Sequence, residues 1–413
     1  MYNVELCHRI KTVISVTIKI DAFKWLTSTE AAPILEDIDQ KLAAKANVLQ
    51  IVKQLRKVVS AEQSALILEL AQLRRRASKK FDRSSQMFFT RRTLEMATDQ
   101  RIAAWKAKRF AGISNIVDIC SGIGGDLIGL AMHVGERIVG VDQEELMVCY
   151  ANANLAAHGV ESSVTQQSFE DFDWSPFEAV HIDPERRSHG RTVRGDHFSP
   201  SLSSILSAAG SDQSLAIKVA PATDCADEAP ADAELNWIGH SRECKQQVVW
   251  LGKLAKNPGC RSVTLLHDQG ETVFIANRNE PVDSSVAKSI GQYLFEPHNA
   301  VLAASLTDEI AHEYELQRIA AHSVYLTGDR AIDNPLLASF KVLESMPSSL
   351  EKVASVFKSM NVGRVEVKKR GVPERIADNY KRLKLTGTEQ ATLLLTRIGN
   401  QRIAIIAERV VHG

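Results

Sequence analysis

A short glycine turn between an expected strand and an expected helix constrains the fold of this chain most. Residues 117–126 read VDICSGIGGD, an apolar run that passes into three closely spaced glycines. The apolar residues that follow have the spacing of one helix face, before a glycine that suits a helix end: Leu127, Leu130, Ala131, Val134 and Gly135. Glycine permits positive φ angles and lets a ligand approach the main chain closely. The run therefore predicts strand, turn and helix, with a small molecule beside the turn.

The spacing of glycines and acids separates two cofactor classes. A dinucleotide fingerprint needs G-x-G-x-x-G, but counting from Gly122 the third glycine position holds Leu127. S-adenosylmethionine fits better, because its methyltransferases place one acid at the end of the first strand and another at the end of the second. Asp118 occupies the first position, and Asp142 ends the run 137–142, where it could accept hydrogen bonds from both ribose hydroxyls. A purely structural turn is the alternative.

Length and composition set broad limits on the fold. A chain of 413 residues suggests two or three domains, and its hydrophobic and charged contents of 44% and 24% are ordinary for a globular protein. The formal net charge is zero, so any nucleic-acid-binding surface must be local. The six cysteines form no C-x-x-C pair and indicate no metal site or disulfide framework. With no leader or membrane-spanning run, we expect a cytoplasmic protein without a membrane partner.

The first 112 residues predict a helical N-terminal domain with a basic stretch. Between positions 74 and 109, three acids face twelve bases: Arg74, Arg75, Arg76, Lys79, Lys80, Arg83, Arg91, Arg92, Arg101, Lys106, Lys108 and Arg109. Phe81, Phe88, Phe89 and Trp105 lie among them. These aromatic side chains could stack on the bases of a nucleic acid. Alternatively, they could form the core of the helical domain, with the basic side chains on its solvated face. The sequence leaves both readings open.

Strands and helices alternate over residues 113–280, which favours a parallel sheet with helices on both faces. Residues 262–266 and 272–276 flank Asp268-Gln269-Gly270 and predict a hairpin at the edge of this sheet. The order is that of a Rossmann-like seven-stranded methyltransferase sheet. Residues 281–413 predict a small third α/β domain, with a helix over 302–321, a turn at 325–329, a helix over 350–360 and three strands at 364–371, 391–396 and 402–407.

Three motifs together resemble a bacterial family of class I S-adenosylmethionine-dependent methyltransferases with a C-terminal THUMP-like domain. That family has a strand end close to D-P-A-R-R followed by G-R and S-P, and this chain has residues 183–187 (DPERR), Gly190-Arg191 and Ser199-Pro200. The runs YLTGD at 325–329 and VGRVEVKKRG at 362–371 resemble its C-terminal domain. The glycine turn is also similar to that of trimethylguanosine-synthase RNA methyltransferases. The resemblance implies S-adenosylmethionine as cofactor.

The expected cofactor-binding residues follow from these motifs: Asp118, Cys120, Gly122, Gly124, Gly125, Asp142, Ser168 and Phe169. The family tends to hold the adenine amino group with an aspartate near the end of the third strand, where this chain has Ser168-Phe169-Glu170-Asp171. Either Ser168 takes that role, or Glu170 or Asp171 does. We further expect a branched side chain at Gly124 to block the cofactor.

Asp183 and Pro184 are the expected catalytic residues. Methyl transfer requires the acceptor to be held in line with the methyl group, and a carboxylate at this strand end could orient an exocyclic amine. The alternative is a purely structural role, in which Asp183 caps the end of the strand and Pro184 shapes the loop. Amino-group methyltransferases commonly have D-P-P-Y or N-P-P-Y at this strand end, and the aromatic residue stacks on the flipped base. In this chain Glu185 and Arg186 follow Asp183-Pro184, and the aromatic residue is absent. Methylation of an exocyclic amine is therefore suggested by the motif but not established by it.

Basic residues near this strand end and in the third domain suggest a phosphate-bearing substrate. The predicted substrate-binding residues are Arg186, Arg187, Arg191, Arg194, Lys368, Lys369 and Arg370. THUMP domains in general bind RNA, so the resemblance implies tRNA or rRNA as partner. The leading hypothesis is an RNA base methyltransferase. The alternatives are a catalytically silent RNA-binding or assembly protein of the same fold, a small-molecule methyltransferase, and an NAD-dependent oxidoreductase.

Overall fold

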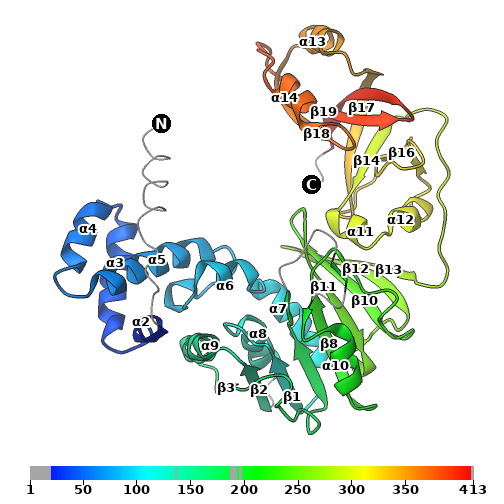
Figure 1. Cartoon of the computed structure of the whole chain (residues 1–413). Helices are drawn as coiled ribbons and strands as arrows, with labels where there is room; N and C mark the ends of the chain where they lie inside the picture. Colours follow the sequence, from blue (N-terminus) through cyan, green and yellow to red (C-terminus); the bar gives the residue numbers. More distant parts are fainter. Residues whose placement is uncertain (1–19, 135–136, 187–192, 195–197, 411–413) are drawn as a thin grey trace. The chain divides into compact units, whose positions relative to one another are not determined.

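The computed structural model describes residues 20–134, 137–186, 193–194 and 198–410. The chain divides into two compact units, residues 1–188 with 196–217, and residues 189–195 with 218–413. Figure 1 labels many of the elements of each unit. The division into three domains at residues 112 and 280 remains a prediction. Within the described residues, no helix is both long and apolar enough to cross a membrane.

The first unit begins with helices, as the composition predicts. They are α2 (Ile20–Trp25), α3 (Ala31–Ala43), α4 (Val48–Leu55), α5 (Ala61–Ala77), α6 (Arg91–Met96) and α7 (Gln100–Ala107), with 3₁₀ turns η1 (Ser84–Gln86) and η2 (Lys108–Phe110). Helix α5 starts at a capping box, in which Ser60 and Gln63 satisfy each other's backbone N–H groups. Its apolar residues Leu66, Ile67, Leu70 and Leu73 are buried. Burial of this stripe explains why the segment is stable despite its many charges.

The aromatic residues of the basic stretch belong mainly to the core. Phe81, Phe89 and Trp105 are buried, and the rings of Phe81 and Phe89 lie 5.8 Å apart. Arg74 is also buried, since its Nε donates to the Met87 carbonyl and its guanidinium pairs with Asp39 at 2.9 Å. The reading of these three aromatics as base-stacking platforms is therefore wrong, whereas exposed bases such as Arg76 still offer a cationic face.

A parallel sheet completes the first unit, with the strand order β3-β2-β1-β4-β8. Its strands are β1 (Asn115–Ile119), β2 (Arg137–Asp142), β3 (Ser163–Gln166), β4 (Ala179–Ile182) and β8 (Ser214–Val219), the last straddling the boundary between the units. Helices α8 (Gly125–Val134), α9 (Glu145–His158) and α10 (Leu202–Ala208) connect them. Strand β1 is central and buried throughout Ile116–Ile119, so its apolar run faces protein on both sides.

The second unit opens with a four-stranded ladder in the order β13-β12-β10-β11. These strands are β10 (Glu234–His240), β11 (Glu243–Leu251), β12 (Cys260–His267) and β13 (Gly270–Asn277). The predicted hairpin is confirmed, because β12 and β13 pair antiparallel across the turn at Asp268. Among the described residues, the sheet contains nine strands instead of the expected seven, because this hairpin adds two strands beyond the β10–β11 pair.

The rest of the second unit is a seven-stranded sheet in the order β15-β16-β14-β17-β20-β19-β18. Its strands are β14 (Tyr293–Pro297), β15 (Gln317–Arg318), β16 (Leu326–Gly328), β17 (Leu337–Pro347), β18 (Val362–Lys369), β19 (Glu389–Ile398) and β20 (Gln401–Arg409). Helices α13 (Leu350–Ser359) and α14 (Glu374–Lys381) pack on it through Val353, Phe357, Ala377 and Tyr380. The predicted helix at 350–360 and the three C-terminal strands are confirmed.

Two local predictions in this unit are wrong. The helix expected over 302–321 is split into α11 (Asn299–Ala303) and α12 (Thr307–Glu313), because Ser305 takes a left-handed φ of 57° that a helix does not allow. The turn expected at 325–329 contains strand β16, which pairs with both β14 and β15.

Candidate active site

The glycine turn adopts the backbone that its sequence predicts. Gly122 and Gly124 have φ angles of 54° and 83°, and Cys120 also has a positive φ of 56°. The Ser121 hydroxyl donates to the Asp118 carbonyl at 2.7 Å. Asn154 of α9 braces the turn from behind, since its Nδ2 donates to the Ile123 carbonyl at 3.0 Å. The turn is therefore held rigidly at the end of β1.

A cavity of about 270 Å³ lies beside this turn, entirely within the first unit. Seven of the predicted site residues line it: Asp118, Cys120, Gly122, Gly125, Asp142, Phe169 and Asp183. The structure thus brings together residues from three strand ends and the turn. Of the predicted cofactor-binding and catalytic residues, Gly124, Ser168 and Pro184 do not line the wall.

Gly124 faces away from the cavity. A Cβ built at this position would lie 3.5 Å from the Ala151 Cβ of helix α9, which is ordinary contact. Glycine is needed at position 124 because of the positive φ angle, and not because a ligand approaches there. The expectation that a side chain at Gly124 would fill the ligand space is therefore wrong.

Ser168 also has a local structural role. Its hydroxyl donates to Asp171 Oδ2 at 2.6 Å and accepts from the Asp171 backbone N–H, which closes a turn after β3. The neighbours Gln167, Phe169 and Glu170 line the cavity instead. Of the candidates for the adenine contact, Glu170 is the one whose position fits.

Asp142 is held at the end of β2 by two backbone donors. Its Oδ2 accepts from Gly122 N–H at 2.8 Å, and its Oδ1 accepts from Glu144 N–H at 2.9 Å. Burial raises the pKa of Asp142 to about 6, although both hydrogen bonds act to lower it. Each oxygen retains acceptor capacity, so this carboxylate could hold a pair of hydroxyl groups.

The cavity wall is strongly acidic. Among the described residues, seven carboxylates line it: Asp118, Asp126, Asp142, Glu144, Glu170, Asp183 and Glu185. Arg92 is the one lysine or arginine that the described residues place on this wall, and it pairs with Glu185. Burial, together with nearby acids, raises the pKa of the Cys120 thiol well above its usual range, so this cysteine stays uncharged. Such a wall favours a cationic ligand.

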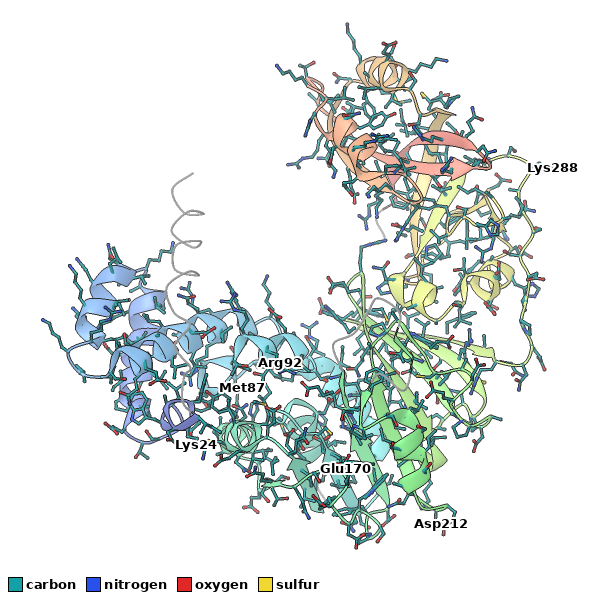
Figure 2. The ribbon with its side chains drawn as sticks, in the orientation of Figure 1. Lys24, Met87, Arg92, Glu170, Asp212 and Lys288 are labelled. Atoms are coloured by element: carbon teal, nitrogen blue, oxygen red, sulfur yellow. The ribbon has the colours of Figure 1, made fainter. Side chains whose placement is uncertain are left out.

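The helical segment supplies wall residues that the sequence analysis missed. Thr90, Arg92, Thr93 and residues 96–98 line the cavity together with the strand ends. Figure 2 labels two wall residues, Arg92 of α6 and Glu170 of the segment after β3. The missed residues form no motif of their own, because their position follows only from tertiary packing, with α7 against α8 and α6 against α5. Their one local signal is the capping box of Thr90 and Thr93 at the start of α6.

Asp183 lies at the carboxyl end of β4, where its backbone N–H donates to the Ile119 carbonyl at 3.2 Å. This bond joins the ends of β4 and β1 and places Asp183 on the wall, whereas Pro184 is buried behind it. Glu185 is a further wall residue that the motif comparison overlooked. Arg187 and Arg191 lie outside the described residues, as do the side chains of Arg186 and Arg194.

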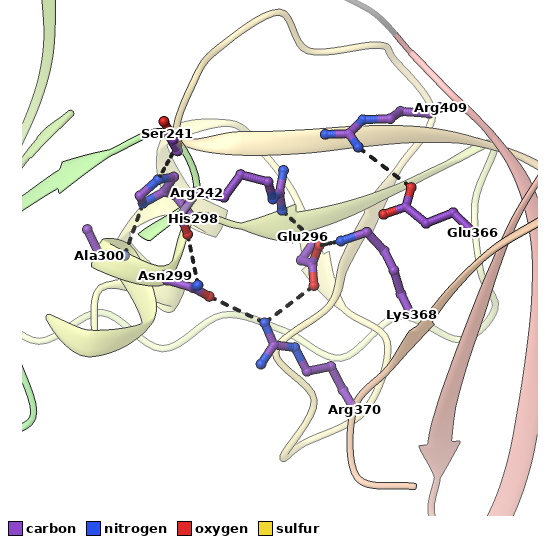
Figure 3. Close-up of polar contacts among 10 residues, drawn as sticks. All are labelled: Ser241, Arg242, Glu296, His298, Asn299, Ala300, Glu366, Lys368, Arg370 and Arg409. Carbon is purple, nitrogen blue, oxygen red and sulfur yellow. Dashed lines mark hydrogen bonds and ion pairs between the residues drawn. The ribbon is translucent and has the colours of Figure 1, made fainter. Parts of the chain in front are cut away.

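The predicted RNA-binding cations of the second unit are largely engaged within the protein. Figure 3 shows Glu296 of β14 between three cations. Its carboxylate lies 2.5 Å from Lys368 Nζ, 2.9 Å from Arg242 Nη2 and 3.4 Å from Arg370 Nη2. Burial acts to raise the pKa of Glu296, but these cations outweigh it and hold that pKa below its usual value. Lys369 pairs with Glu374.

These ion pairs join the turn after β10 to the C-terminal sheet. Asn299 Nδ2 donates to the Arg242 carbonyl, and His298 Nε2 contacts the Ser241 carbonyl, each at 2.8 Å (Figure 3). The Lys368 side chain is only 15% exposed, so a role as a phosphate contact is not supported for it. Arg370 is 40% exposed and keeps guanidinium surface for a further partner.

Comparisons with known proteins agree with this architecture. Residues 337–409 match the family model described as THUMP domain-like, and residues 19–77 match a domain of unknown function. An uncharacterised S-adenosylmethionine-dependent methyltransferase of Mycobacterium tuberculosis is 29% identical over 345 residues, 81% of this chain and 92% of the relative. The match is the same in strains CDC 1551 / Oshkosh and H37Rv.

A solved structure from Porphyromonas gingivalis W83, described provisionally as a methyltransferase, has the same fold. It superposes with a TM-score of 0.70 at 19% identity, over 86% of this chain and 92% of that one. The sheet order, the glycine turn and these matches together define the class: a class I methyltransferase fold with a C-terminal THUMP-like domain. The expected class I methyltransferase fold with a C-terminal THUMP-like domain is confirmed.

Proposed function

We propose that this protein is an S-adenosylmethionine-dependent methyltransferase that modifies a base of tRNA or rRNA. The observation that carries the proposal is the acidic cavity at the glycine turn, with seven carboxylates on its wall. S-adenosylmethionine bears a positive sulfonium, which this wall attracts. An NAD-type cofactor would bring an anionic pyrophosphate to this acidic wall, which would repel it. The name of the mycobacterial relatives supports the same cofactor.

Different residues of the cavity wall would bind different parts of this cofactor. Asp142 would accept hydrogen bonds from the two ribose hydroxyls, since both its oxygens are fixed by backbone donors. Glu170 lies where it could accept from the adenine amino group, and the glycine turn lets the ligand reach the main chain. When bound, the cofactor supplies an activated methyl group.

Asp183 would position the methyl acceptor. A carboxylate on the cavity wall can accept a hydrogen bond from an exocyclic amine and so direct the nitrogen lone pair to the reacting carbon. The bound cofactor would supply the methyl group, and Asp183 would hold the amine so that its lone pair faces that group; the amine would give up one proton after the transfer. The THUMP-like domain supports RNA as the substrate, because THUMP domains are RNA-binding modules.

Transfer of a labelled methyl group tests this proposal. Purified protein is incubated with methyl-tritiated S-adenosylmethionine and total RNA from a strain that lacks the gene. We expect label in this RNA and little in RNA from the parent strain, whose target sites are already modified. Cofactor binding without transfer to either RNA would favour a silent RNA-binding protein or a small-molecule methyltransferase.

A further inference from the structure

A chain of buried polar side chains runs from the cavity wall to the helical segment. Lys106 of α7 is only 1% exposed, and its Nζ lies 2.7 Å from Asp126 Oδ1 and 3.0 Å from His181 Nε2. His181 Nδ1 in turn lies 2.6 Å from Asp118 Oδ1. Thr98 completes the chain by donating its hydroxyl to Asp126 Oδ2 at 2.6 Å. Asp118 and Asp126 belong to the cavity wall, while Lys106 and His181 lie behind it.

The hydrogen bonds determine the charge of this network. A lysine ammonium and a doubly protonated imidazole cannot face each other at 3.0 Å, because both would be donors. Lys106 and His181 therefore share one positive charge, and the Nδ1 proton of a neutral His181 points to Asp118. Two carboxylates face this single charge. With both ionised, the network carries one surplus negative charge.

The surplus lies at Asp118, because Asp126 is the carboxylate that pairs with Lys106, through Oδ1 at 2.7 Å, and its Oδ2 accepts the Thr98 hydrogen bond at 2.6 Å. Asp118 Oδ2 is buried and has no hydrogen-bond partner among the residues the structure describes. Burial has the largest effect on the pKa of Asp118 and raises it. The neighbouring His181 acts in the opposite direction, but the pKa remains above its usual value. The other titratable groups around Asp118 are Asp126, Asp142, Asp183 and Cys120, besides Lys106 and His181.

We propose that this buried network makes the site selective for a positively charged cofactor over its uncharged product, with Asp118 as the residue that determines the selectivity. The proposal rests on S-adenosylmethionine as the cofactor. That molecule carries one net positive charge, whereas S-adenosylhomocysteine, which is left after transfer, carries none. A surplus charge in a buried site attracts the first and not the second. The same charge thereby favours release of the product.

Calorimetric titration of both compounds tests the selectivity. In Asp118→Asn the surplus is removed, so the affinity ratio of S-adenosylmethionine to S-adenosylhomocysteine should fall by roughly tenfold or more. Asp212→Asn removes an exposed acid outside the cavity and should leave the ratio unchanged. An unchanged affinity ratio in a folded Asp118→Asn variant would overturn this inference but would leave the proposed function standing. If the wild-type protein bound neither compound, the proposed cofactor itself would be wrong.

The wild-type protein offers a second test that needs no buried substitution. As the pH is lowered from neutral within the range where the protein stays folded, Asp118, whose pKa burial raises, takes up a proton and cancels the surplus, so the affinity ratio should fall. Asp142 does not disturb this comparison, because both compounds carry the same ribose. A ratio that stays constant over this range would refute the proposal, even if the Asp118→Asn variant failed to fold.

Discussion

Acidification should weaken the hold of Asp142 on the adenosine part of the cofactor. The pKa of this carboxyl is raised from 3.8 to about 6, so it is ionised at neutral pH and about nine-tenths protonated at pH 5. A protonated carboxyl has lost the charge that strengthens its hydrogen bonds to hydroxyl groups. Because the raised pKa lies within a convenient range, a single residue can be titrated without changing the sequence.

The expected size of the effect follows from the hydrogen bonds. Bonds to a charged acceptor contribute roughly 1.5–3 kcal/mol, which is about tenfold or more in affinity. Linkage limits the loss to about tenfold for each pH unit below the pKa of the free protein. From pH 7 to pH 5, we therefore expect S-adenosylhomocysteine affinity to fall by about tenfold. This thioether avoids the sulfonium charge, so the change reports mainly on the ribose contact.

Isothermal calorimetry over this pH range is the assay, with Asp142→Asn as the matched control. The amide cannot ionise, so this variant should bind at least about tenfold more weakly at pH 7 and show little further change down to pH 5. Any remaining slope in Asp142→Asn measures the contribution of other groups, including Asp118. Wild-type affinity that is constant from pH 7 to pH 5 would contradict the ribose assignment.

Three substitutions test other parts of the account. Gly124→Ala should lower stability by about 1 kcal/mol through its positive φ while leaving S-adenosylmethionine affinity near that of the wild type; loss of binding in the folded variant would mean that the residue contacts the cofactor. Glu296→Ala should lower the free energy of unfolding by roughly 3–5 kcal/mol, because three cations lose their buried partner. The control Glu366→Ala removes only a half-exposed pair with Arg409 and should cost much less; equal losses in the two variants would refute the central position of Glu296. Asp183→Asn should lower turnover strongly and change cofactor and RNA affinity by less than about twofold, and a normal turnover rate would remove its positioning role.

Much of the fold could be predicted because its signals are local. The run 117–126 carries strand, turn and helix in one stretch, and the structure has β1, the positive φ angles and α8 in that order. The hairpin around Asp268 has the same local character. Where a helix depends on backbone detail, the prediction failed: Ser305 breaks the expected 302–321 helix, and no glycine or proline marks that position.

The site was predictable only in the parts that belong to strand ends. Asp118, Asp142 and Asp183 each follow an apolar run, so the parallel order alone places them at one sheet edge. Lys106 and His181 lie 75 residues apart and meet only after α7 packs on the sheet, so spacing could not pair them. Likewise, the basic run at 368–370 reads as a nucleic-acid contact until Glu296 is found buried among its side chains.

The most direct test of the proposed function is mass spectrometry of modified nucleosides in total RNA. Three strains are compared: one lacking the gene, the same strain complemented with the wild-type gene, and the same strain complemented with Asp183→Asn. We predict that one methylated nucleoside is lost in the deletion strain, returns with the wild-type gene and stays absent or strongly reduced with the variant. Identical methylated-nucleoside profiles in all three strains would contradict the assignment of this protein as an RNA methyltransferase.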